Sequence, residues 1–196
     1  MFSNYIGVKY ALSTSNCTTA LHLALKAIGV RKGDEVICPA LTFISPIHMV
    51  RLSGAQPVLV DIEENTWNID PEKIQRSITN KTKAIIIVHA FGHSAKMDKI
   101  LEIAKENNLY VIEDVAEALG AEFENKKLGS FGHISCFSFF ANKMLTCGEG
   151  GMALTFDKNL YEKMSSLREY GRSKEEKYLY DDVGYNYRMT NMQAAV

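Results

Sequence analysis

The sequence has no apolar run that approaches the ~20 residues of a membrane-spanning helix. Its first residues also lack the charged-then-apolar pattern of a secretory signal. Neither sign of charge is in excess, since 22 basic and 23 acidic side chains give a net charge of −1. Proteins that bind nucleic acid or membrane surfaces usually carry a basic excess, so we expect neither partner.

Paired-cysteine motifs are also missing. The four cysteines show no CxxC spacing and lie mostly in apolar runs, so we interpret them as reduced, buried thiols of a cytoplasmic protein. The only close histidine pair, His89 and His93, has no cysteine or paired carboxylates nearby, and we predict no metal site. The motifs GxGxxG, GxxxxGK(S/T) and GxSxG do not occur, which gives little support to a nucleoside triphosphatase or a serine hydrolase.

What the sequence does contain is an alternation of short apolar segments and amphipathic segments. Strands are predicted at residues 8–12, 35–38, 58–60, 84–88 and 110–112. Helices are predicted between them at residues 18–28, 43–52, 70–78 and 97–106. This alternation predicts an α/β fold of three layers, with a mostly parallel sheet between two layers of helices. The 196 residues correspond to about one domain.

The later part of the chain changes character. Two strands, 134–140 and 152–156, follow each other without a helix between them. A helix is then predicted at 160–170, an exposed charged loop at 172–182, and the start of another helix near 189. Lys143 lies in the polar turn between the two strands. Such a lysine is either a surface residue whose charged end reaches water or an amine held in a pocket to form a Schiff base.

Ligands of an open parallel sheet bind beyond the carboxyl ends of its strands, and three features lie there. The hydroxyl-rich turn at 13–19 opens a helix, and it either binds a phosphate or only caps the helix through Asn16 or Thr18. Asp114 is a metal ligand, a catalytic base, the partner of a cationic ring or a simple helix cap. Lys143 either takes part in binding an anion or faces water.

Together these features are the groups that pyridoxal phosphate requires. The turn holds its 5′-phosphate, the carboxylate keeps its ring nitrogen protonated, and the lysine forms a Schiff base with its aldehyde. Ser138, five residues before the lysine, either helps to hold the anion or faces water. Phe43 follows another strand end and is placed to cover one face of the ring, the alternative being an ordinary core phenylalanine.

Five motifs run through almost the whole chain: SNCTTALHLAL (15–25), GDEVICPALTF (33–43), VIEDVAEALGA (111–121), GSFGHISCFSFFANKMLTCGEGGM (129–152) and VGYNYRMTNMQAA (183–195). In kind and order they resemble the DegT/DnrJ/EryC1/StrS family of sugar-nucleotide aminotransferases. The resemblance implies the large domain of the aspartate aminotransferase fold, known as fold type I. Within the family, the form FFANK…GEGG with GYNYRMTN resembles the GDP-perosamine synthases.

The resemblance also assigns roles to individual residues. Lys143 matches the Schiff-base lysine, Asp114 matches the partner of the pyridine nitrogen, and Phe43 matches the ring-stacking aromatic residue. The other matches are cofactor-binding positions, namely Cys17 and Thr18 in the phosphate turn, the phosphate-binding Ser138, Glu117 beside the cofactor, and Asn186, which reaches the phosphate of a neighbouring subunit. Cys17 stands where glycine or alanine is common in the family, an exchange that is tolerated if only its backbone N–H is used.

The implied reaction transfers an amino group from glutamate to a 4-keto-6-deoxy sugar nucleotide, with Lys143 moving a proton as general acid–base. The implied substrate is GDP-4-keto-6-deoxymannose, which would be converted to GDP-perosamine for surface polysaccharide. A UDP- or dTDP-linked keto sugar is the alternative. A homodimer with shared active sites is expected, because Asn186 matches a residue that crosses to the neighbouring subunit. Relatives that replace the lysine by histidine are sugar dehydratases, and Lys143 argues against that activity here.

Relatives in the family carry an N-terminal arm before the segment that matches residues 7–10, and a small domain after the segment that matches residues 183–195. We therefore expect residues 1–196 to be an incomplete pyridoxal-phosphate-binding large domain. The small domain contributes to the sugar site, so an inactive fragment, or one that only binds the cofactor, is a further alternative.

Overall fold

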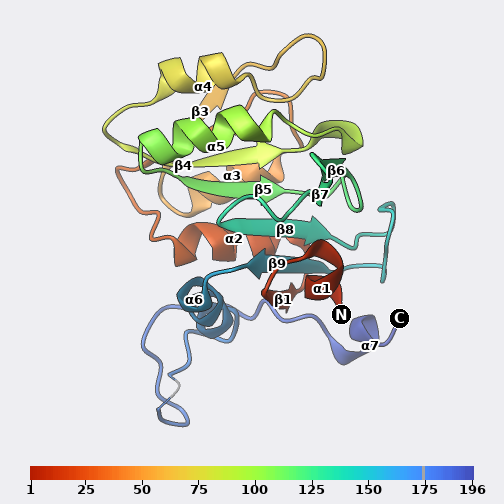
Figure 1. The fold of residues 1–196 in the computed structure, drawn as a ribbon. Helices are drawn as coiled ribbons and strands as arrows, with labels where there is room; N and C mark the ends of the chain where they lie inside the picture. Colours follow the sequence, from red (N-terminus) through yellow and green to blue (C-terminus); the bar gives the residue numbers. More distant parts are fainter. Residues whose placement is uncertain (174) are drawn as a thin grey trace.

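A computed structural model describes residues 1–173 and 175–196 of the chain. Its centre is a seven-stranded sheet in the order β1-β9-β8-β5-β4-β2-β3 (Figure 1). Strand β9 is antiparallel to β1 and β8, and the other neighbours are parallel. The strands are β1 Tyr10–Thr14, β2 Glu35–Pro39, β3 Gln56–Val60, β4 Thr82–Val88, β5 Tyr110–Asp114, β8 Ile134–Ser138 and β9 Gly151–Thr155. A separate hairpin pairs β6 Glu122–Phe123 with β7 Lys126–Lys127.

Helices cover both faces of the sheet, which gives the three layers predicted from the sequence (Figure 1). One layer contains α2, α3 and α6, and the other contains α4 and α5. The helices are α1 Phe2–Ile6, α2 Cys17–Ala27, α3 Ser45–Leu52, α4 Pro71–Ser77, α5 Met97–Glu106, α6 Lys158–Arg168 and α7 Asn191–Ala194, with a 3₁₀ turn η1 at Ala90–Gly92. The α/β fold class is confirmed.

The central strands are buried on both faces because their apolar residues are continuous rather than alternating. In β4, Ala84 and Ile86 pack with the α2 layer, whereas Ile85 and Ile87 pack with α4 and α5. Successive side chains of a strand point to opposite faces, so one β-branched run supplies two cores. No helix in the described part of the chain is long and apolar enough to cross a membrane.

Several local expectations were wrong in detail. Helix α3 begins at Ser45, with Pro46 in its first turn, rather than at residue 43. Helix α1 and the β6–β7 hairpin were not foreseen, and α7 is shorter than the pattern after residue 189 indicated. The loop expected at 172–182 contains no helix or strand in its described residues, and Lys174 lies outside them.

Candidate functional site

The ends of four neighbouring strands meet at one edge of the sheet. Asp114 ends β5 and Ser138 ends β8, while Thr14 ends β1. Because β9 is antiparallel, its first residue, Gly151, lies at the same edge, opposite both Thr14 and Ser138. The topology therefore gathers features that are separated by more than a hundred residues in the sequence.

The turn before α2 both caps the helix and leaves donors free. The Asn16 side chain accepts a hydrogen bond from Thr19 N at 2.9 Å, and Thr19 Oγ1 accepts one from Asn16 N at 3.3 Å. This is a capping box, so capping by Asn16 is confirmed. The N–H groups of Cys17 and Thr18 have no acceptor in the described part of the chain. They are two free donors at the positive end of a helix dipole, an arrangement suited to an anion.

Gly151 is a residue of this edge that the motif reading did not single out. A Cβ atom built on Gly151 would lie 2.4 Å from the carbonyl carbon of Asn16 and 2.6 Å from Cys17 N. The start of β9 thus lies directly against the turn that opens α2, and only glycine allows this approach. The glycine-rich run at 148–151 is visible in the sequence, but nothing in the sequence indicates that it packs against the turn at Asn16 and Cys17.

Asp114 is buried at the centre of the edge. Its Oδ1 atom accepts a hydrogen bond from Ala116 N at 3.0 Å and lies 3.8 Å from the thiol sulfur of Cys17. Its Oδ2 atom receives no hydrogen bond from the described residues. Oδ2 is not one of the fully buried side-chain atoms that lack a partner, so this oxygen is accessible to a donor that the chain itself does not provide.

Burial dominates the electrostatics of this carboxyl. It raises the pKa of Asp114 to about 6, against the smaller opposing effects of the Ala116 N–H, of the His89 ring and of the Lys143 amine. Burial also raises the pKa of the Cys17 thiol well above its usual value, with the charge of Asp114 as the next cause. Cys17 is therefore a protonated thiol at neutral pH, able to donate weakly to Asp114.

Lys143 lies in the turn after β8, where its backbone N–H donates to Phe140 O at 2.9 Å. The side chain is 23% exposed, and its Nζ lies 3.8 Å from Glu117 Oε1. Glu117 Oε2 in turn accepts a hydrogen bond from Phe91 N at 3.0 Å. The amine is thus directed toward Glu117 beyond the end of β5, and its charge also acts on Asp114.

The remaining predicted residues divide into two groups. Ser138 is at the edge, where its Oγ accepts a hydrogen bond from Phe140 N at 3.4 Å, and Thr18 Oγ1 lies 2.9 Å from Ser45 Oγ. Phe43 is 73% exposed, so the interpretation of an ordinary core phenylalanine was wrong. Asn186 is exposed and forms an isolated bridge with Glu169, and the next residue, Tyr187, accepts a backbone hydrogen bond at 2.9 Å from Ser15 N in the turn before α2.

Solved aminotransferases share this fold. The chain superposes on an aminotransferase from Psychrobacter cryohalolentis with a TM-score of 0.94 and 41% identity, over 99% of this chain and 52% of that one. Superposition on NtdA from Bacillus subtilis, solved with bound cofactor PMP, gives a TM-score of 0.91 and 36% identity, over 99% and 44% of the two chains. The class that the fold and these solved neighbours define is therefore that of the pyridoxal-phosphate-dependent aminotransferases.

The chain belongs to the DegT/DnrJ/EryC1/StrS aminotransferase family, whose model matches residues 1–196. Similar curated proteins are the GDP-perosamine synthases of Escherichia coli O157:H7, 49% identical, and Caulobacter vibrioides, 52% identical, each over 195 residues. A dTDP-3-amino-3,6-dideoxy-alpha-D-galactopyranose transaminase of Aneurinibacillus thermoaerophilus is 44% identical over 196 residues. Each match covers 100% of this chain but only 53–54% of the relative, so the chain spans about half the length of the curated relatives it matches.

Proposed function

We propose that residues 1–196 are the cofactor-binding large domain of a pyridoxal-phosphate-dependent aminotransferase that acts on a nucleotide-linked keto sugar. The observation that carries the proposal is the buried Asp114 carboxylate with its open Oδ2 atom. The residues around it fit the cofactor, because a cationic ring N–H would satisfy this oxygen and would favour the ionised carboxylate. The free N–H groups of Cys17 and Thr18 would hold the phosphate.

Pyridoxal phosphate supplies the electron sink for amino transfer when it is bound. The chain's own part is to hold and orient that ring and to move protons. Asp114 would keep the ring nitrogen protonated, Phe43 would cover one face of the ring, and Ser138 would add a hydroxyl donor to the phosphate. Lys143 Nζ would carry the proton during transfer, and Glu117, 3.8 Å away, would hold the amine in position.

Glutamate is the proposed amino donor, and GDP-4-keto-6-deoxymannose is the proposed acceptor, giving GDP-perosamine for surface polysaccharide. The similarity to two GDP-perosamine synthases at 49% and 52% identity supports this choice. A UDP- or dTDP-linked keto sugar is the alternative, supported by the transaminase of Aneurinibacillus thermoaerophilus at 44% identity.

The active protein is proposed to be a cytoplasmic homodimer in which Asn186 of one subunit reaches the phosphate held by the other. The exposed position of Asn186 supports this, because its side chain is free to contact a second chain. A complete acceptor site would then require a second copy of the chain. It would also require a segment equivalent to the part of the longer relatives that this chain does not cover.

Borohydride reduction tests the cofactor role. The protein is incubated with pyridoxal phosphate and reduced, and the labelled peptide is mapped by mass spectrometry. Label on Lys143 in the native chain, lost in Lys143→Ala, is the expected result. Lys158→Ala is the matched control, because Lys158 is an exposed lysine in α6 whose loss leaves the site intact. Label elsewhere, or none, would contradict the assignment of Lys143.

A turnover assay separates amino transfer from the alternatives. With glutamate and GDP-4-keto-6-deoxymannose, the expected product has gained an amine, and its mass identifies it. Loss of a sugar hydroxyl without gain of an amine would indicate a dehydratase. Labelling of Lys143 without any product would support a part of the enzyme that only binds the cofactor.

A further inference from the structure

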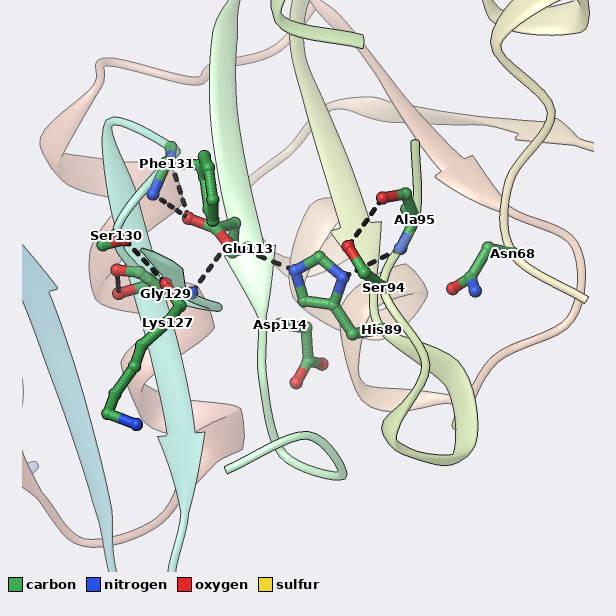
Figure 2. Close-up of polar contacts among 12 residues, drawn as sticks. Asn68, His89, Ser94, Ala95, Glu113, Asp114, Lys127, Gly129, Ser130 and Phe131 are labelled. Carbon is green, nitrogen blue, oxygen red and sulfur yellow. Dashed lines mark hydrogen bonds and ion pairs between the residues drawn. The ribbon is translucent and has the colours of Figure 1, made fainter. Parts of the chain in front are cut away.

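Glu113, the residue before Asp114, is completely buried and yet fully satisfied. Its Oε1 atom accepts hydrogen bonds from Phe131 N at 2.9 Å and Gly132 N at 2.6 Å. Its Oε2 atom accepts one from Gly129 N at 2.8 Å and lies 3.2 Å from His89 Nε2. Figure 2 shows Glu113 between the loop that contains Gly129 and Phe131 on one side and His89 on the other.

The hydrogen bonds fix the charge of both side chains. His89 Nδ1 lies 3.3 Å from Ala95 N and must accept from that N–H, so the imidazole is neutral and carries its proton on Nε2. This Nε2–H then donates to Glu113. A carboxyl group that accepts four hydrogen bonds has no free lone pair left to bind a proton. Glu113 is therefore ionised. The pair is a buried anion held by a neutral histidine.

The pair joins the strands that flank the candidate site. His89 follows β4 directly, and its backbone N–H donates to Asp114 O at 3.2 Å. The loop 129–132, which Glu113 binds, leads into β8, where Cys136 is the register partner of Asp114. Glu113 therefore ties the end of β5 to β4 through His89 and to the start of β8 through the loop. The carboxyl of Asp114 points away from this network in Figure 2.

We propose that the His89–Glu113 pair is the positioning element for Asp114, holding its backbone so that the open carboxylate oxygen meets the ring nitrogen of the cofactor. The inference rests on the proposed pyridoxal phosphate site. Among the described residues, the carboxyl group of Asp114 has only one backbone N–H and one thiol as partners, so its position depends on the backbone, which is paired with Val88 of β4 and Cys136 of β8. A site of this kind has to be held to within ~0.5 Å by its supporting residues.

Two substitutions of His89 separate the effect of its Nε2–H donor from the effect of its side-chain volume. In His89→Asn the side-chain oxygen still reaches Ala95 N, but no atom reaches Glu113. In His89→Gln the side-chain amide nitrogen lies near the position of Nε2 and can still donate to Glu113. His48→Asn is the matched control, because His48 is exposed on α3. Circular dichroism establishes that each variant is folded.

Binding is measured for pyridoxal phosphate and for an analogue in which C–H replaces the ring nitrogen. We expect His89→Asn to weaken pyridoxal phosphate about tenfold, the loss of one charge-assisted hydrogen bond, and to leave the analogue unchanged. We expect His89→Gln and His48→Asn to resemble the native chain. Equal weakening of both ligands in His89→Asn would overturn the inference and leave the proposed function standing. Failure of the native chain to bind either ligand would contradict the proposed function, and the inference with it.

A second measurement needs no substitution. Nitrogen-15 NMR of the native chain without cofactor reports the state of each imidazole. A single neutral form of His89 with the proton on Nε2 is expected. A protonated imidazole, or a proton on Nδ1, would contradict the arrangement from which the positioning role is derived, whether or not His89→Asn folds.

Discussion

Strand β5 ends in two neighbouring carboxylates that face opposite sides of the sheet. Glu113 lies on the side of α5, and Asp114 lies on the side of α2, where Cys17 and Cys136 are packed. Both are buried, at 0% and 5% exposure. Glu113 has four donors, whereas Asp114 has one N–H and a weak thiol. Of these two neighbouring carboxylates, Glu113 therefore has its hydrogen bonds made by the protein, whereas Asp114 keeps an oxygen free to accept another.

The difference separates a structural carboxylate from one prepared for a ligand. A buried charge with all of its hydrogen bonds made contributes to a defined fold, and a buried charge without them costs stability until a partner arrives. The raised pKa of Asp114 has the same cause, because burial disfavours the ionised carboxylate and so favours its protonated form. Substitutions at the two positions should therefore act in opposite directions.

The largest effect is expected from Glu113→Ala. The substitution leaves three backbone N–H groups and the His89 Nε2–H buried without an acceptor. We expect the free energy of unfolding to fall by about 4 kcal/mol, as when one partner of a buried pair is removed. Urea denaturation measures the change. Glu102→Ala, at an exposed position of α5, is the control and should stay within ~0.5 kcal/mol of the native chain.

Asp114→Asn should have the opposite sign in the cofactor-free chain. The amide keeps an oxygen for Ala116 N and removes a buried negative charge. With the pKa moved from 3.8 to about 6, we expect a gain of about 3 kcal/mol in unfolding free energy at pH 7. Binding of pyridoxal phosphate should be lost in the same variant. A less stable Asp114→Asn chain would show that the carboxylate has partners beyond those described.

The pH dependence sharpens the comparison. Because the pKa of Asp114 is raised in the fold, the folded chain binds this proton more tightly than the unfolded chain. The resulting stability is complete below pH 4 and is lost as the pH rises to about 6. The unfolding free energy is measured against pH for the native chain and for Asp114→Asn. The difference between the two chains should show this slope, because the subtraction removes the titration of the other groups. A flat difference would contradict the raised pKa.

The smallest effect is expected from Cys17→Ala. The Sγ atom is 3.8 Å from Asp114 Oδ1, a weak contact, and the backbone N–H that faces the phosphate position is unchanged. We expect a loss of about 1 kcal/mol in stability and a change of less than about threefold in pyridoxal phosphate affinity. Calorimetric titration measures the affinity, and a change comparable to that of Asp114→Asn would give the thiol a larger role than its geometry indicates.

Elements with strong local signals could be predicted from the sequence. Helix α5 has the predicted bounds, Met97–Glu106, because its apolar and charged residues alternate with helical period. The helix predicted at 70–78 begins where Asp70 accepts a hydrogen bond from Glu72 N, since aspartate followed by proline favours a helix start. Asp114 was placed at a strand end because the preceding apolar run is unambiguous.

Features that depend on contacts between distant segments could not be predicted. His89 and Glu113 are 24 residues apart, and nothing in either segment indicates that they meet. The β6–β7 hairpin was missed because its two-residue turn, Glu124 and Asn125, adopts left-handed backbone angles without glycine. The exposure of Phe43 also depends on what surrounds it, which a single motif does not specify.

The position of β9 has a consequence for synthesis of the chain on the ribosome. In the described part of the chain, strand β1 is at the edge of the sheet and pairs only with β9, whose residues begin at Gly151. At ~5–20 residues per second, a nascent β1 waits on the order of ten seconds for its partner. Until then the turn after β1 has no strand to lie against. The turn at 13–19 is therefore translated well before Gly151 and takes its final shape only after β9 has joined the sheet.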